Sequence, residues 1–237
     1  MNIAVIFAGG TGQRMSNASV PKQFLEYRGK PILVYTLEKF QRHPSVDALI
    51  VVMLQEWIEN TQRLIREYGL SKVSAVIPGG ETGFLSRYRG VMKAKELYPA
   101  DSVILMHDGV RPLIDADTID RDIACVREKG SAITVAPAIE TVAVKTDSGE
   151  VGQILDRSVC QLAKAPQCFY LGDLALAHEK AFAEGKTDFI DCAFLMQHYG
   201  YALHTVEGRS DNIKITTPID FYLFGAYVEA NEHEQHF

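Results

Sequence analysis

Short apolar runs alternate with longer amphipathic stretches along the first 137 residues of the chain. The short runs are rich in β-branched residues, which is typical of buried strands, and the longer stretches repeat apolar residues at helical spacing. The predicted strands are 3–7, 48–53, 73–77, 102–106 and 132–136, and the predicted helices are 31–42, 55–69, 84–97 and 117–129. Strands that alternate with helices predict an α/β fold with a mostly parallel sheet.

The pattern changes after Pro137. Two short extended segments, 141–144 and 151–155, flank a turn-rich stretch, which predicts a β-hairpin. A hairpin does not belong in a doubly wound core, so we expect residues 138–157 to form an arm that projects from the domain. The remaining predicted elements are helices at 172–184 and 190–198, a strand at 201–206 and a final helix from about 218.

Composition limits the class of protein. A chain of 237 residues with 47% hydrophobic content predicts one domain, 1–237, with a sizeable core. It has no apolar run of about 18 residues or more and no charged stretch before its first apolar segment, so we expect a cytoplasmic protein without a membrane partner. The four cysteines lack the spacing of a metal site or disulfide framework. A net charge of -6 argues against a nucleic-acid partner, so local cations must hold any anionic ligand.

A glycine-rich loop, FAGGTGQRM at 7–15, follows the first apolar run. Glycines at such a strand end let backbone N–H groups approach an anion closely. Met15 stands where a dinucleotide-binding fingerprint needs its third glycine, and Gln13 and Arg14 stand where a Walker A loop needs lysine and then serine or threonine. The loop instead delivers Arg14 and, a little further on, Lys22, a pair of cations that suits a triphosphate.

A second group of polar residues, His107 and Asp108, falls where the strand at 102–106 should end. Ligands of open parallel sheets bind outside the carboxyl ends of the strands. A carboxylate at that position could hold Mg²⁺, which prefers oxygen ligands and substrate phosphates. With equal weight, Asp108 could be a loop residue paired with Arg111.

A third group occupies residues 206–218, which join a strand to a helix. Thr216 or Thr217 would cap this helix before Pro218, and Lys214 would then lie near the sheet edge and the positive end of the helix. The alternative is an ordinary capped turn with a solvated lysine.

Six motifs in one order resemble those of a known family. They are AGGTGQRM at 8–15, PKQF at 21–24, GG at 79–80, HDGVRP at 107–112, PQCF at 166–169 and EGRSDNIKITTP at 207–218. Together they look like the cytidylyltransferases that act on alditol and methylerythritol phosphates, and they span nearly the whole chain. The resemblance implies a Rossmann-like sheet with a projecting β-arm, used in a homodimer.

The resemblance also implies a reaction and its residues. The phosphate of a sugar-alcohol phosphate would attack the α-phosphate of CTP in line and release pyrophosphate, without a covalent intermediate. The residues that would bind CTP are Ala8, Gly9, Gly10, Thr11, Gly12, Gly80, Glu81 and Ser86. The catalytic cations would be Arg14, Lys22 and Lys214, with Mg²⁺ on Asp108. The acceptor would meet Arg111, Thr141 and Arg157, and Arg157, which lies on the arm, would serve the partner subunit's site.

Two acceptors and a further class of protein remain open. The double glycine of AGGTG and the valine of HDGVRP resemble the ribitol 5-phosphate branch, whereas the methylerythritol phosphate branch tends to carry AAG and HDAARP. We therefore expect D-ribitol 5-phosphate as acceptor and CDP-ribitol as product. Gly83, Leu85 and Ala165 stand where the family usually has arginine, an acidic residue and threonine, so a diverged, non-catalytic nucleotide-binding module is the alternative of another class.

Overall fold

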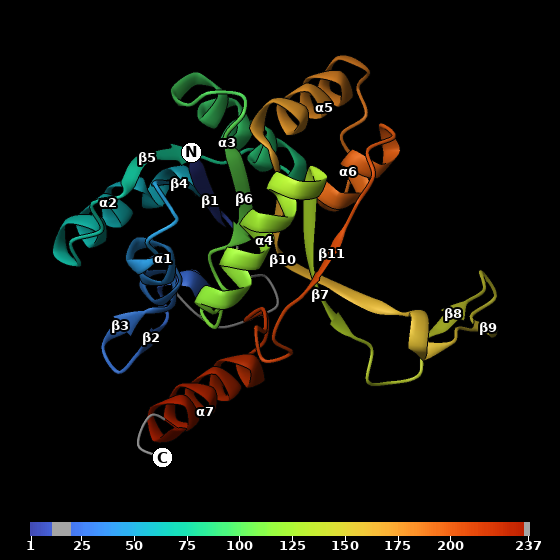
Figure 1. Ribbon diagram of the computed structural model, residues 1–237. Coiled ribbons are helices and arrows are strands. Elements are labelled where there is room, and N and C mark those ends of the chain that lie inside the picture. Colours follow the sequence, from blue (N-terminus) through green and yellow to red (C-terminus); the bar gives the residue numbers. More distant parts are fainter. Residues whose placement is uncertain (11–19, 235–237) are drawn as a thin grey trace.

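The structure, a computed structural model, describes residues 1–10 and 20–234. Its centre is a seven-stranded sheet with the order β11-β7-β10-β6-β1-β4-β5 (Figure 1). The strands are β1 Asn2–Ala8, β4 Ala48–Met53, β5 Val73–Pro78, β6 Val103–Asp108, β7 Ser131–Pro137, β10 Gln161–Tyr170 and β11 Thr205–Glu207. The helices are α1 Ile32–Arg42, α2 Ile58–Glu67, α3 Gly83–Leu97, α4 Ala116–Lys129, α5 Leu171–Ala183, α6 Cys192–His198 and α7 Pro218–Glu234.

Each face of the sheet has its own hydrophobic core, because successive side chains of a strand point to opposite faces. Ala4 and Ile6 of β1 pack with α1, α2 and α4 on one face. Ile3 and Val5 of the same strand pack with α3, α5 and α6 on the other. Burial of both faces explains why the central strands are continuous apolar runs.

The predicted α/β class and mostly parallel sheet are confirmed, and one central strand was missed. β10 pairs antiparallel with both β6 and β7. Pro166 lies within it and lacks the N–H that a ladder needs, so proline in such a run argues against a central strand. The ladder accommodates this residue because its register with β7 shifts between Ala163 and Gln167.

Smaller differences concern element boundaries and short additional elements. The strand predicted at 201–206 is the short β11, and the helix predicted at 55–69 begins as a 3₁₀ turn, η2 (Gln55–Trp57), before α2. A small hairpin of β2 (Glu26–Tyr27) and β3 (Lys30–Pro31), which the sequence did not indicate, precedes α1. Two further 3₁₀ turns, η1 (Lys22–Phe24) and η3 (Arg157–Val159), lie beside the pocket described below and on the arm, respectively.

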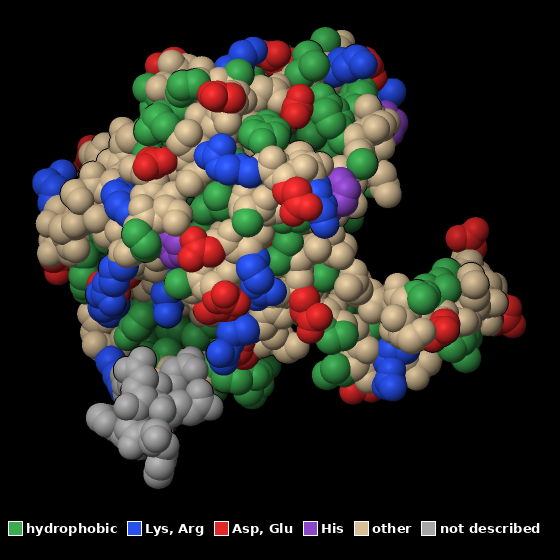
Figure 2. All heavy atoms as spheres, in the orientation of Figure 1, with side chains coloured by type: hydrophobic (Ala, Val, Ile, Leu, Met, Phe, Trp, Pro, Cys, Tyr) green, Lys and Arg blue, Asp and Glu red, His purple; other side chains and the backbone are tan. Residues whose placement is uncertain are grey.

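The predicted arm is confirmed as a hairpin of β8 (Ala143–Lys145) and β9 (Val151–Ile154). It stands away from the body in Figures 1 and 2. The single-domain boundary 1–237 and the use of the arm in dimerisation stay predictions. In the part of the chain that the structure describes, no helix combines the length and the apolar character needed to cross a membrane.

Candidate active site

A pocket of about 670 Å³ lies at the carboxyl edge of the sheet. Residues that follow β1, β5, β6 and β11 line it, and the first half of the antiparallel β10 closes one side. Parallel strands bring their carboxyl ends to one edge, so segments far apart in the sequence meet there. Four glycines of the lining define what we call the glycine wall (Gly9, Gly10, Gly80 and Gly83), and five charged residues define the charged wall (Asp108, Arg111, Lys164, Asp191 and Lys214).

Gly80 anchors the glycine wall. The hydroxyl of Ser86 accepts a hydrogen bond from the backbone N–H of Gly80 at 3.1 Å and lies 3.3 Å from its carbonyl oxygen. A Cβ on Gly80 would lie 2.3 Å from the Cβ of Leu85, so no other residue fits there without movement. The glycine pair is therefore held against the start of α3 with its backbone facing the pocket.

Gln23 fixes the other part of this wall. Its side chain is buried and donates to the carbonyl oxygen of Ala8 at 2.6 Å. This bond ties η1, which begins at Lys22, to the end of β1. Gln23 was not predicted as a site residue, although it lies within the PKQF motif.

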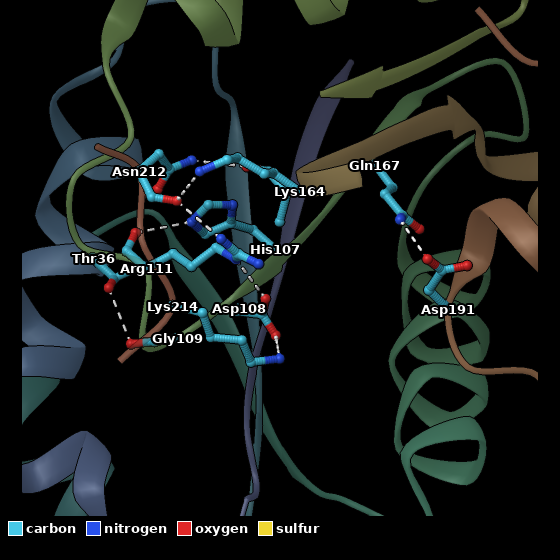
Figure 3. A network of polar contacts seen from close by, with 11 residues as sticks. Thr36, His107, Asp108, Gly109, Arg111, Lys164, Gln167, Asp191, Asn212 and Lys214 are labelled. Carbon is cyan, nitrogen blue, oxygen red and sulfur yellow. Dashed lines mark hydrogen bonds and ion pairs between the residues drawn. The ribbon is translucent and has the colours of Figure 1, made fainter. Parts of the chain in front are cut away.

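Asp108 occupies the centre of the charged wall (Figure 3). One carboxylate oxygen accepts from Lys214 Nζ at 2.7 Å and the other from Arg111 Nε at 2.9 Å. Burial alone would raise the pKa of Asp108, but the charges and hydrogen bonds of Lys214 and Arg111 outweigh it and hold that pKa well below its usual range. The carboxylate is therefore ionised, and the predicted alternative of a pair with Arg111 is present.

Asp108 is also suited to one mode of magnesium binding. The described residues contain no group of three or more His, Cys, Asp or Glu side chains that could enclose a metal. Mg²⁺, however, is commonly held by one carboxylate together with substrate phosphates. The ionised Asp108 meets that requirement, and the magnesium site stays a prediction.

His107 supports the HDGVRP loop. Its ring packs against Phe40 at 5.0 Å between centroids, and its Nε2 lies 3.1 Å from the carbonyl oxygen of Arg111. Burial lowers the pKa of His107 to about 4, so the ring is neutral at pH 7. Thr36 donates to the carbonyl oxygen of Gly109 at 3.0 Å. The loop that carries Arg111 is thus fixed from two sides.

The loop that carries Lys214 is held by its own backbone carbonyls. Arg111 donates to the carbonyl oxygen of Asn212 at 2.9 Å, and Lys164 of β10 donates to that of Ser210 at 2.8 Å. The buried side chain of Asn212 donates to the carbonyl oxygen of Ala165 at 2.9 Å. Lys164 was missed by the sequence prediction, and its signal was a lysine in an otherwise apolar stretch beside Pro166.

The start of α7 corrects one prediction. Thr216 and Thr217 do not cap the helix with their hydroxyl oxygens; both hydroxyls and both backbone N–H groups donate to one carboxylate oxygen of Asp220, at 2.7–2.9 Å. A carboxylate in the first turn can accept from the N–H groups before the helix and also opposes the positive helix end. The cap is therefore Asp220, and it fixes the exit of the Lys214 loop.

Gln167 and Asp191 form the far side of the charged wall (Figure 3). The side-chain amide of Gln167 donates to Asp191 at 2.9 Å and accepts from the backbone N–H of Ala193 at 2.9 Å. Asp191 also accepts from the N–H of Phe194 at 2.8 Å at the start of α6. Neither residue was predicted as part of the site.

The predicted site residues divide into three groups. Those that line the pocket are Ala8, Gly9, Gly10, Lys22, Gly80, Glu81, Ser86, Asp108, Arg111 and Lys214. Thr11, Gly12 and Arg14 lie outside the described residues. Thr141 and Arg157 lie on the arm and do not line the pocket of their own chain; Arg157 donates to the carbonyl oxygen of Ile139 at 2.9 Å.

An open, mostly parallel sheet with a glycine-lined, cation-rich pocket at its carboxyl edge is typical of nucleotide-binding α/β enzymes. The model of the 2-C-methyl-D-erythritol 4-phosphate cytidylyltransferase family (IspD) matches residues 2–230. The chain belongs to this family, so it is a nucleotidyltransferase, and the predicted family and enzyme class are confirmed.

Individual relatives carry two names. A ribitol-5-phosphate cytidylyltransferase of Vibrio parahaemolyticus is 47% identical over 237 residues, the full length of both chains. A 2-C-methyl-D-erythritol 4-phosphate cytidylyltransferase of Clostridium botulinum is 36% identical over 222 residues, which is 94% of this chain and 95% of that protein. The crystal structure of 4-diphosphocytidyl-2C-methyl-D-erythritol synthase from Anaerococcus prevotii superimposes with a TM-score of 0.82 at 26% identity, covering 96% of this chain and 95% of the other.

Proposed function

We propose that the protein transfers CMP from CTP to D-ribitol 5-phosphate, giving CDP-ribitol and pyrophosphate. One observation carries this proposal: the glycine wall and the cations Lys22, Arg111 and Lys214 line a single pocket, in which Asp108 pairs with Arg111 and Lys214. Such a pocket suits two phosphate-bearing substrates that must meet. The 47% identity to ribitol-5-phosphate cytidylyltransferase over the full chain supports the choice of acceptor.

CTP would lie along the glycine wall. Ala8, Gly80, Glu81 and Ser86 would contact the nucleoside, and the backbone at Gly9 and Gly10 would meet the phosphates, with Thr11, Gly12 and Arg14 as further predicted contacts. Lys22 and Lys214 would neutralise the charge that develops at the α-phosphate, which is the main way proteins accelerate phosphoryl transfer. Magnesium held by Asp108 and the substrate phosphates would supply further neutralisation of that charge.

The acceptor phosphate would enter from the charged wall. Arg111 would orient it for in-line attack on the α-phosphate, and the fixed geometry of its loop would reduce the entropic cost of alignment. Because Asp108 already fixes Arg111 and Lys214, these cations are arranged before substrate arrives. No side chain acts as a nucleophile in this reaction.

We propose in addition that the protein works as a homodimer in which the arm completes the partner's site. The arm carries four exposed apolar residues, Ile139, Val144, Val151 and Ile154. A two-stranded hairpin is marginal without a packing surface. A two-fold symmetric dimer would cover the arm and bring Thr141 and Arg157 to the acceptor of the other subunit. The predicted cytoplasmic location stays a prediction.

The second candidate acceptor is 2-C-methyl-D-erythritol 4-phosphate, which the family model and the Clostridium botulinum relative favour. A pyrophosphate-release assay with CTP and Mg²⁺ separates the candidates when ribitol 5-phosphate, methylerythritol 4-phosphate and glycerol 3-phosphate are compared. We expect the largest kcat/KM with ribitol 5-phosphate. If the protein binds CTP but releases no pyrophosphate from it with any of the three acceptors, the result would instead support a non-catalytic nucleotide-binding module, the alternative that Gly83, Leu85 and Ala165 suggest.

A further inference from the structure

Lys164 lines the pocket but has no role in the reaction proposed above. It lies on β10, beside the register shift of that strand, and its side chain faces the charged wall. Its Nζ donates to the carbonyl oxygen of Ser210 at 2.8 Å and lies 3.4 Å from that of Asn212. The second distance is longer than usual for an N–H···O hydrogen bond, so the bond to Ser210 is the stronger of the two.

Charge is unbalanced on this side of the pocket. Asp108 is the carboxylate that pairs with Arg111 and Lys214, and no described carboxylate oxygen lies within 4.0 Å of Lys164 Nζ. Asp211 also acts on the charge of Lys164, but from beyond this distance. A half-buried ammonium group without an anionic partner is unfavourable, and a bound anion would relieve that cost. A phosphate monoester, which carries nearly two negative charges at pH 7, is an anion of this kind.

The geometry brings two of these cations, Lys164 and Arg111, to one place. Arg111 also donates to the carbonyl oxygen of Asn212, at 2.9 Å, so its guanidinium and the Lys164 ammonium lie on either side of one oxygen atom (Figure 3). A phosphate group has several oxygens that can accept from both, and charge-assisted bonds of this kind are stronger than bonds to a neutral carbonyl. The four-carbon stem of lysine lets Nζ turn from the carbonyl to such an anion.

The electrostatic setting of Lys164 agrees with this arrangement. Burial, and after it the positive charge of Arg111, lowers the pKa of Lys164, and the charge of Asp211 opposes this only in part. An anion bound between the two side chains would act in the opposite direction and favour the charged lysine.

We propose that Lys164 binds the phosphate of the acceptor together with Arg111, and that this pair selects a dianionic phosphate monoester as the nucleophile. The inference rests on the proposed function, because it concerns the acceptor side of that reaction. It assigns Lys164 a substrate contact. A lysine that only held the Ser210–Asn212 backbone would be a positioning residue for Lys214.

Steady-state kinetics of pyrophosphate release separate the two roles. Lys164→Met keeps the length of the side chain and removes its charge, Lys164→Arg restores a charge, and Lys95→Met removes an exposed lysine of α3 that pairs with Glu179. We expect Lys164→Met to raise the acceptor KM about tenfold or more, with the KM for CTP changed by less than about twofold. Lys164→Arg should recover part of the loss, and Lys95→Met should match the wild type.

A loss of kcat with equal changes in both KM values would overturn the proposal, because a displaced Lys214 loop affects both substrates. An unchanged acceptor KM would overturn it as well.

Inorganic phosphate provides a probe that does not depend on the identity of the acceptor. In the presence of CTP and Mg²⁺ we expect phosphate to bind the wild type, measured by calorimetry, and to bind Lys164→Met about tenfold more weakly. Equal binding to both proteins contradicts the Lys164 inference even if no alditol phosphate is turned over. Absence of turnover with weakened phosphate binding contradicts only the proposed function.

Discussion

The carboxyl edge of the sheet and the arm differ in how their polar and apolar groups are satisfied. At the sheet edge, Asp108 is bonded to two cations, and the backbones of Gly80, Gly109 and Asn212 are each held by a side chain. On the arm, every side chain of β8 and β9 is exposed, including Val151 at 67% and Ile154 at 66%. Figure 2 shows hydrophobic side chains at the surface of the arm.

The sheet edge is therefore a preformed site, whereas the arm is an incomplete one. At the sheet edge, hydrogen bonds and ion pairs within the chain hold the cations in position without substrate. Such preorganisation is the condition for effective charge stabilisation in the transition state. The arm buries too little apolar surface to be stable alone. Its residues can act at an active site only when the arm packs on another surface. We therefore expect substitutions in the two regions to have different effects.

The largest effect is expected at the preformed edge. Lys22→Ala removes a cation that acts mainly in the transition state, so kcat should fall about 100-fold or more while CTP binding suffers less. Lys186→Ala, which removes an exposed lysine paired with Glu184, is the control and should leave kcat unchanged. Near wild-type turnover of Lys22→Ala in the pyrophosphate-release assay would exclude the assigned role.

The next effect concerns the carboxylate at the centre of the charged wall. Asp108→Asn removes the anion that aligns Arg111 and Lys214 and replaces a carboxylate by a poorer magnesium ligand, so activity should fall about 10- to 100-fold at saturating CTP. A magnesium role predicts that the activity of the variant needs a higher Mg²⁺ concentration. If Asp108 only aligns the cations, melting temperature and activity will fall with an unchanged Mg²⁺ dependence.

The arm gives the third prediction, which tests the shared site directly. Lys22→Ala and Arg157→Ala proteins should each be inactive, but a heterodimer of the two contains one site that lacks both side chains and one intact site. An equal mixture should recover about a quarter of wild-type activity after subunit exchange, because about half of the dimers are mixed. Each variant incubated alone is the control. Heterodimers that form and stay inactive would mean that each subunit supplies its own Arg157.

The same contrast explains which parts could be predicted from the sequence. Strands and helices of the body follow from local periodicity, and the residues after β1 and β6 were placed correctly because parallel strands must end at one edge. The hairpin was also predictable, since its turn chemistry is local. The family resemblance indicated that the six motifs together form one active site, which no single motif could show.

What the sequence did not reveal depends on contacts between distant segments. β10 was missed because Pro166 argues against a central strand. Lys164 and Gln167 of that strand were therefore missed as well. Their partners, Ser210 and Asp191, lie 46 and 24 residues away in the sequence. The cap of α7 was assigned to the threonines because hydroxyls usually accept at that position, whereas here Asp220 accepts instead. These errors concern partners, which residue type alone does not determine.

The smallest predicted effect concerns a carboxyl group buried in the body, for which the exposed arm has no counterpart. Asp122 of α4 is fully buried, accepts from Thr134 at 2.8 Å, and has its pKa raised to about 7 by burial. Between about pH 4 and 7 the folded protein therefore keeps a proton that the unfolded chain releases, so Asp122 makes the free energy of unfolding fall as pH rises through this range.

Asp122→Asn should remove this loss of stability, because the amide has nearly the same shape and does not ionise. His107 and His178, whose pKa values are lowered to about 4 by burial, act in the opposite sense, so the prediction concerns the difference between variant and wild type. In urea unfolding, the free energy of unfolding of Asp122→Asn relative to wild type should increase from pH 4 to pH 8 by a few kcal/mol, about 4 at most. Asp101→Asn, at an exposed position, is the matched control. A difference that is independent of pH would show that Asp122 is already charged in the folded protein below pH 4.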